Sequence, residues 1–203
     1  MKPTLLRTLA TAALVSVFTL AGCSDNDDMS GMPGHANSPS PTATASGPAT
    51  TSTEFNDADV TFAQMMIPHH EQAVEMSDMI LAKEGVNPDV IALAQQIKAA
   101  QQPEIDTMKS WLSAWGRPTM AGGHQMGDGP MTEEEMKTLD EADGPTGQKL
   151  FLEGMIKHHQ GAIRMAQTEI TNGNNADAIA LARNIVDTQQ KEITTIEGLL
   201  AKL

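Results

Sequence analysis

Apolar residues recur at i, i+3, i+4 and i+7 along four long segments of the chain, a spacing that gathers them on one face of an α-helix. The segments are rich in Ala, Leu, Gln, Glu, Met and Lys, which favour helix formation. None of them shows the apolar–polar alternation of a strand. The pattern predicts helices near residues 56–83, 88–114, 147–171 and 176–202.

Turn and cap residues separate the predicted helices. Gly85, Asn87 and Pro88 offer a stop, an N-cap and a first-turn proline, and residues 172–175 (Asn-Gly-Asn-Asn) offer similar signals in the second half. Residues 132–135 (Thr-Glu-Glu-Glu) form a capping box that starts a short extra helix near 132–141. Two hairpins with short loops and one longer central connection predict an all-α fold, an antiparallel four-helix bundle, over residues 54–203.

The chain contains an internal duplication. The segment from Phe62 to Met76 matches the segment from Phe151 to Met165 at an offset of 89 residues. A second pair of segments follows at an offset of 88, in which Gln101 and Glu104 recur as Gln189 and Glu192. Each half therefore holds two helices, and the halves are related as wholes.

The duplicated segment places polar and apolar residues on one helical face. At 100° per residue, six positions of each copy fall within an arc of about 120°, the width of a stripe that faces a core. In the first copy these are Phe62, Met66, His69, His70, Ala73 and Met76, and in the second Phe151, Met155, His158, His159, Ala162 and Met165. If the halves pack about a pseudo-twofold axis, we expect four histidines and at least four methionines to converge inside the bundle.

Two interpretations of this stripe compete. A methionine stripe is usually core packing, and a single histidine on such a face is usually a hydrogen-bonded core residue. Here, however, four of the six histidines form two adjacent pairs at repeated positions, each beside methionines. This arrangement favours a metal site with the ligands Met66, His69, His70, Met76, Met155, His158, His159 and Met165.

The chemical types of the predicted ligands indicate which metal ion the site would bind. Thioethers are soft donors that favour Cu(I), and imidazole is also a copper ligand. Glu71 and Glu75 fall on the solvent side of the stripe, and neither repeat contains the Glu-x-x-His spacing of di-iron bundles. Copper, preferably as Cu(I), is therefore the expected ion.

Composition and charge narrow the range of possible binding partners and metal sites. The chain has 14 Met but a single Cys, so it can build neither a disulfide framework nor a thiolate metal site by itself. Its formal net charge is −13, or −15 without Lys2 and Arg7 of the leader. Such a surface repels phosphate backbones and attracts cations, which argues against nucleic acid as a partner.

The N-terminal region resembles the start of a bacterial lipoprotein. Residues 1–22 read as a signal peptide whose apolar run, Leu9 to Leu20, is too short to span a membrane comfortably. The following Cys23 completes a sequence that resembles a lipobox, so we expect Cys23 to carry the lipid that tethers the protein to the extracytoplasmic face of the cell membrane. The alternative is a plain secretory leader. Residues 23–53, rich in Ser, Thr and Pro, are the expected disordered stalk.

Further methionines and histidines form candidate secondary metal ligands. The stalk carries Met29, Met32 and His35, and the Gly-rich central connection carries Met120, His124, Met126 and Met131. Met65, directly before Met66 in the first copy of the repeat, is a further candidate. Chance composition is the alternative explanation for the clusters outside the bundle.

The doubled segment Met-x-x-His-His-x-x-Ala-x-x-Met, from Met66 to Met76 and from Met155 to Met165, resembles the signature of the DUF305 (domain of unknown function 305) family over roughly residues 54–202. The resemblance implies a ferritin-like four-helix bundle in an exported bacterial protein, and some members resemble copper-binding and copper-resistance proteins. The family commonly has an Asp three residues before the Phe of each motif. Asp59 fits this pattern, whereas Gln148 stands in the second copy.

Taken together, these features predict an exported, lipid-anchored protein that binds copper for sequestration or for delivery to an exchange partner that the sequence does not identify. We find no nucleophile–base pair, cofactor motif or carboxylate dyad, and so we expect a protein that is not an enzyme. Two alternatives remain open: a ferritin-like dinuclear metal oxidase, and a metal-free envelope adaptor whose histidines only hydrogen-bond in the core.

Overall fold

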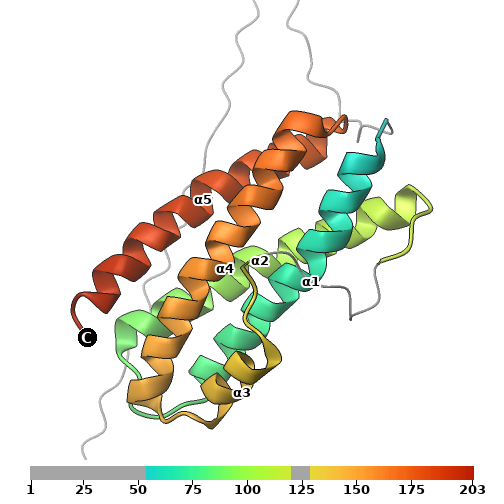
Figure 1. The fold of residues 1–203 in the computed structure, drawn as a ribbon. Coiled ribbons are helices and arrows are strands. Elements are labelled where there is room, and N and C mark those ends of the chain that lie inside the picture. The colour runs from blue at the N-terminus through green and yellow to red at the C-terminus, as the bar shows by residue number, and fades with distance from the viewer. Residues whose placement is uncertain (1–53, 120–128) are drawn as a thin grey trace, which may run out of the picture. The chain divides into compact units, whose positions relative to one another are not determined.

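The structure, a computed structural model, describes residues 54–119 and 129–203 (Figure 1). Within these ranges it is helical, with five helices: α1 (Asp57–Leu81), α2 (Pro88–Ala114), α3 (Glu133–Glu141), α4 (Gly144–Asn172) and α5 (Ala176–Leu200). None of the described helices is long and apolar enough to cross a membrane. Several predicted features lie outside the described residues: the expected signal peptide and stalk, with Cys23, Met29, Met32 and His35, and the candidate ligands Met120, His124 and Met126.

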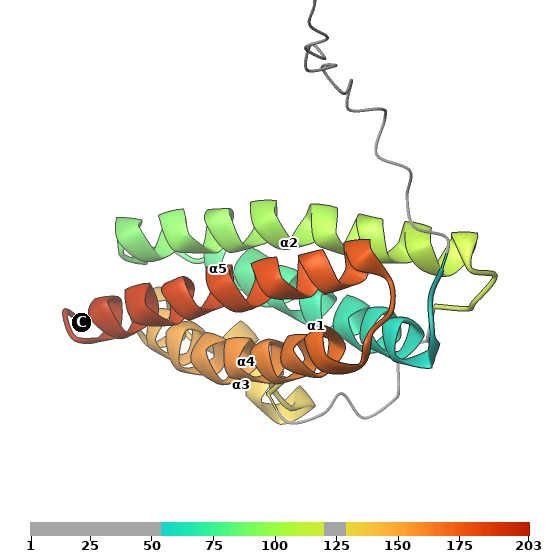
Figure 2. The same ribbon diagram turned by 90° about the horizontal axis from the view of Figure 1, so that it is seen from above.

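The four long helices form two antiparallel hairpins, α1 with α2 and α4 with α5, which meet mainly through α1 and α4 (Figures 1 and 2). The short α3 packs against α1 and α4. This arrangement confirms the predicted all-α four-helix bundle with an extra helix in the central connection. It also makes the α1–α4 contact, where the two copies of the repeated motif face each other, the centre of the molecule.

Most helix ends follow the predicted cap residues. Asn87 caps α2 by accepting from the Asp89 amide at 2.8 Å, and Thr132 and Glu135 form the predicted capping box of α3. The start of α4 differs, because this helix begins at Gly144 and not near residue 147. Asp143 is its N-cap, accepting from the Thr146 amide at 2.8 Å, and a proline lies in its first turn.

The glycine that ends α4 has a different role from the one expected. Gly173 has φ −67°, outside the left-handed region that a glycine C-cap normally adopts. A Cβ at this position would overlap the carboxyl group of Glu169. Gly173 is therefore required for space, because it lets a buried glutamate lie against the backbone.

The apolar core is divided into two clusters by the histidines. One cluster uses the first half of α1, the second half of α2, the second half of α4 and the first half of α5, and the other uses the opposite halves together with α3. Met66 belongs to the first cluster and Met76 to the second. The four repeated histidines belong to neither cluster and form a polar layer at the middle of the bundle.

Asp59 and Gln148 hold the two hairpins together at repeated positions. Asp59 is fully buried and accepts the backbone N–H groups of Asn56, Asn174 and Asn175, so it joins the start of α1 to the α4–α5 turn. Gln148 accepts the backbone N–H of Asn87 at 2.8 Å and so joins α4 to the α1–α2 turn. The amide in the second copy thus keeps one of the contacts that the carboxylate makes in the first.

Candidate metal centre

His69 on α1 and His158 on α4 meet at the centre of the bundle. Their ring centroids lie 3.7 Å apart and their planes are inclined by 45°. The side chains are buried, and none of the four ring nitrogens has a hydrogen-bond partner among the described residues. A buried polar atom without a partner costs about 1–3 kcal/mol, so this pair is an expensive arrangement if it serves only to fill space.

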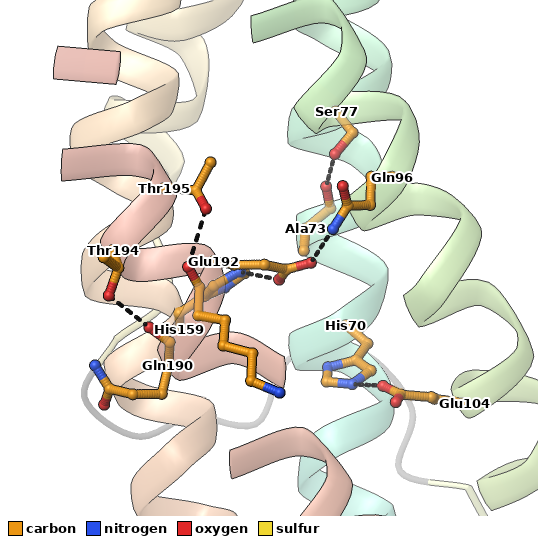
Figure 3. A network of polar contacts seen from close by, with 11 residues as sticks. His70, Ala73, Ser77, Gln96, Glu104, His159, Gln190, Glu192, Thr194 and Thr195 are labelled. Carbon is orange, nitrogen blue, oxygen red and sulfur yellow. Dashed lines mark hydrogen bonds and ion pairs between the residues drawn. The ribbon is translucent and has the colours of Figure 1, made fainter. Parts of the chain in front are cut away.

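The second histidine of each pair, His70 or His159, bonds a glutamate on the outer helix of its own hairpin (Figure 3). The Nε2–H of His70 donates to Glu104 Oε2 at 2.8 Å, and the Nε2–H of His159 donates to Glu192 Oε2 at 2.7 Å. Because a carboxylate can only accept, a hydrogen is assigned to Nε2 of each ring. Neither Nδ1 atom has a partner in the described protein.

The environment keeps the two central rings uncharged. Burial lowers the pKa of His69 well below its usual 6.5, and the charge that His158 and His70 would carry when protonated lowers it further. Burial lowers the pKa of His158 in the same direction, assisted by His159. Both rings are therefore neutral at pH 7, which is the form that binds metal ions.

The repeated methionines lie in a line along the α1–α4 contact. Met66 and Met155 are fully buried, and each is three residues from the central histidine of its own helix. At 1.5 Å per residue, antiparallel helices place them about 4.5 Å to either side of the histidine layer, whereas Met76 and Met165 lie about 10 Å from it. The eight predicted ligands thus form a ladder and not one compact cluster, with Met66 and Met155 nearest the imidazoles.

Glu104 and Glu192 are residues whose role the sequence did not reveal. Their recurrence in the repeat was visible, but the histidines that they bond lie more than 30 positions away on another helix. One turn earlier on the same helices, Gln101 and Gln189 are also buried, and both carry side-chain oxygens without partners. Recurrence of a polar residue at the same position of both copies is the one sequence signal that these four residues share, and it did not identify their partners.

The donor set fits a soft metal ion better than a hard one. Among the described residues, no three His, Cys, Asp or Glu side chains are grouped as a metal site. A site at this layer must therefore combine imidazole nitrogens with thioether sulfurs, and that combination favours Cu(I). The unpartnered nitrogens of His69 and His158, with Met66 and Met155 beside them, are the residues that would hold the ion.

Two repeated helical hairpins that bury paired imidazoles between their inner helices define an all-α bundle with a candidate internal metal centre. The DUF305 family, described as a domain of unknown function, matches residues 59–200, and the chain belongs to this family. No curated protein matches the sequence.

Solved structures support the same assignment. A DUF305 fragment from Deinococcus radiodurans has a TM-score of 0.68 and 32% identity, covering 73% of this chain and 98% of that one. A DUF305 protein from Streptomyces coelicolor has a TM-score of 0.67 and 32% identity, covering 71% and 93%. The protein CopM in its Cu(I)-bound form has a TM-score of 0.60 and 31% identity, covering 71% and 96%. CopM has also been solved in Cu(II)-bound and silver-bound forms, which indicates metal binding within this fold.

Proposed function

We propose that this protein is an exported, lipid-anchored copper-binding protein that holds Cu(I) at the histidine layer between α1 and α4, for sequestration or delivery at the cell envelope. The observation that carries the proposal is the contact of His69 and His158, whose four ring nitrogens are buried and have no partner in the described protein. Neutral imidazoles with free lone pairs are competent metal ligands.

The choice of Cu(I) rests on the thioethers. Met66 and Met155 are buried on either side of the layer, and a neutral set of nitrogen and sulfur donors suits a soft monovalent ion. The similarity to CopM, solved with copper and with silver, supports the same choice. The strongly acidic chain would also attract cations to the surface of the bundle.

The location rests on the sequence. The signal peptide of residues 1–22 and the lipobox-like residues before Cys23 support export and lipid attachment on the extracytoplasmic face of the cell membrane. A Cys23→Ser variant should be released from the membrane fraction, and its N-terminal peptide should lack the mass of the acyl chains. A variant that stays in the membrane fraction would contradict the anchor.

The test of copper binding is an anaerobic Cu(I) competition titration against a chromogenic chelator. The wild-type protein should withdraw Cu(I) from the chelator, and the double variant His69→Ala/His158→Ala should bind its tightest equivalent at least tenfold more weakly. Ser77→Ala is the matched control, because Ser77 is a buried polar residue of α1 that bonds only its own helix, at the carbonyl of Ala73. Equal affinity of the wild-type protein and the double variant would remove the histidine layer from the proposal.

Two further measurements on the wild-type protein distinguish the copper carrier from an oxidase and from a metal-free adaptor. An oxidase would consume oxygen in a metal-dependent reaction with turnover, whereas a carrier only binds and releases its ion. A metal-free adaptor would unfold at the same temperature with or without Cu(I). A carrier with free Cu(I) at 100 times its Kd should gain about 2.7 kcal/mol of unfolding free energy, measured as a rise in Tm.

A further inference from the structure

The two copies of the repeated motif differ at the position just before the first methionine of the stripe. Met65 occupies this position in α1, and Gly154 occupies it in α4. The repeat therefore lacks one thioether in its second copy. The surroundings of these two residues show how the structure compensates for that loss.

At the Met65 end, two thioethers face a common pocket. Met65 and Met165 line a cavity of about 450 Å³ between α1 and α4, together with Asp57 and Glu169. Both methionines are half-buried and contribute to the wall of this cavity. The Glu169 carboxyl is 1% exposed and lies beside the buried Asp59 carboxylate. A cation held by the two sulfurs would therefore meet a buried carboxyl group in the same pocket.

At the Gly154 end, a methionine from the central connection supplies the missing thioether. A Cβ on Gly154 would lie 2.7 Å from the sulfur of Met131 and 3.3 Å from the terminal methyl of Met76. Met76 is the repeat counterpart of Met165. Met131 thus occupies the space that a methionine at position 154 would fill, and it forms with Met76 the counterpart of the Met65–Met165 pair.

This second pair also borders an opening to the surface. Met131 and Gly154 line a cavity of about 140 Å³ whose other walls include Glu134, Glu135 and Glu153. The carboxylates give this opening a negative charge that attracts cations, although Lys157 also lies on its wall. Met131 thus lies between this opening and the fully buried Met76, whereas Met65 and Met165 both line the cavity at the other end of the ladder.

The backbone of Met131 is held by specific contacts. Its N–H donates to Gln72 Oε1 at 2.8 Å, and Gln72 Nε2 donates to its carbonyl at 2.9 Å. Gly129, at φ +135°, passes so close to α4 that a Cβ there would lie 2.8 Å from the Cα of Gly161. Gly161 is the repeat counterpart of Gln72, so a second difference between the copies also serves to seat this segment.

We propose that Met65–Met165 and Met76–Met131 are two outer soft-cation sites, which receive Cu(I) at the two ends of the ladder and pass it inward to the histidine layer. The identity of the ion rests on the proposed function, but the two thioether pairs do not. Along the helix axes, Met76 and Met165 lie about 10 Å from the imidazoles, and Met65 and Gly154, against which Met131 packs, lie about 6 Å from them. Two sulfurs without a nitrogen ligand should hold the ion more weakly than the central layer, as a loading site requires.

The test is an anaerobic Cu(I) titration of the protein with competing chelators of graded affinity. Met131→Leu keeps the apolar bulk that anchors the connection but removes the sulfur, and it should lose one weakly held equivalent. Met65→Leu should lose another, and the double variant should lose both. Met136→Leu is the matched control, since Met136 is a buried methionine of α3 in the same core region and should retain every equivalent.

A rescue variant separates a ligand from a packing residue. Met131→Ala combined with Gly154→Met moves the thioether onto α4, where the first copy of the repeat carries it as Met65, and should restore the lost equivalent. The Met76 methyl, 3.3 Å from the new Cβ, has to yield by a few tenths of an ångström. Met131→Ala alone should bind one weakly held equivalent of Cu(I) fewer than the wild-type protein.

The outcomes distinguish this proposal from the proposed function. If His69→Ala/His158→Ala loses the tight equivalent while Met131→Leu loses nothing, the histidine layer stands and the outer sites are wrong. If Met131→Leu loses a weak equivalent while the histidine variant keeps the tight one, the outer sites stand and the central site is wrong. If Met131→Ala alone binds as many equivalents of Cu(I) as the wild-type protein, the outer site at Met131 is also wrong.

Discussion

His69 and His158 are repeat counterparts, and their rings meet at the middle of the bundle with 3.7 Å between centroids. A residue touches its own counterpart only where it lies near the axis that relates the two halves. Duplication of one helical hairpin has therefore turned a single histidine into a pair of facing ligands, in the same way that a twofold interface between two chains brings equivalent residues together.

The glutamates that bond the outer histidines should tune copper binding. Glu104→Ala and Glu192→Ala each free the imidazole of a predicted ligand, His70 or His159, to rotate and to change tautomer. Losing such a partner of a ligand histidine typically weakens metal affinity ten- to hundredfold. We expect a loss of this size from each variant in the Cu(I) competition titration. The control is Glu71→Ala, which removes an exposed ion pair with Lys109 at 2.7 Å and should leave affinity unchanged. A tenfold loss in the control would point to net charge as the cause.

The metal-free protein should lose stability in acid because of His69 and His158. Their pKa values are lowered on folding, so below about 6.5 the unfolded chain binds protons that the folded chain does not. The free energy of unfolding should fall as the pH drops through 6.5, by up to about 1.4 kcal/mol per pH unit for each ring. Urea unfolding between pH 7.5 and 5 measures this slope, and His69→Leu/His158→Leu should flatten it. An unchanged slope in the variant would show that the buried rings are protonated in the folded protein.

Glu169 should produce the opposite pH dependence. Burial, and then the nearby Asp59 carboxylate, raise its pKa from 4.5 to about 8 in the folded protein. Between these values the unfolded chain releases a proton that the folded chain keeps, so stability falls as pH rises toward 8. Glu169→Gln should remove this loss and gain stability relative to wild type at pH 8, as urea unfolding would measure. Glu153→Gln, at an exposed position, should show no such pH-dependent gain.

The unequal roles of Asp59 and Gln148 give a stability prediction. Asp59→Ala removes the acceptor for three buried or partly buried backbone N–H groups and should cost about 2–3 kcal/mol. Gln148→Ala removes the acceptor for one, at Asn87, and should cost about 1 kcal/mol. Denaturant midpoints at constant m-value measure both. Equal costs would mean that the extra bonds to Asp59 contribute little.

The sequence determined the helices and their pairing to a large extent. Periodicity and cap residues predicted the four long helices, the short α3 and the capping box at Thr132, because these features depend on residues only a few positions apart. The start of α4 was missed because the Asp143 cap and its proline precede the apolar pattern. Gly173 was misread because its neighbour Glu169 is buried, and the burial of one glutamate is not visible in a local pattern.

The sequence by itself determined which side chains share a helical face, since 3.6 residues per turn fixes that relation within one helix. It also determined that the face occurs twice. Only the tertiary structure decided that His69 meets His158 while His70 and His159 turn to Glu104 and Glu192, and that Met131 fills the space above Gly154. Those contacts join residues on different elements, so they depend on how the hairpins pack and on where the central connection crosses α4.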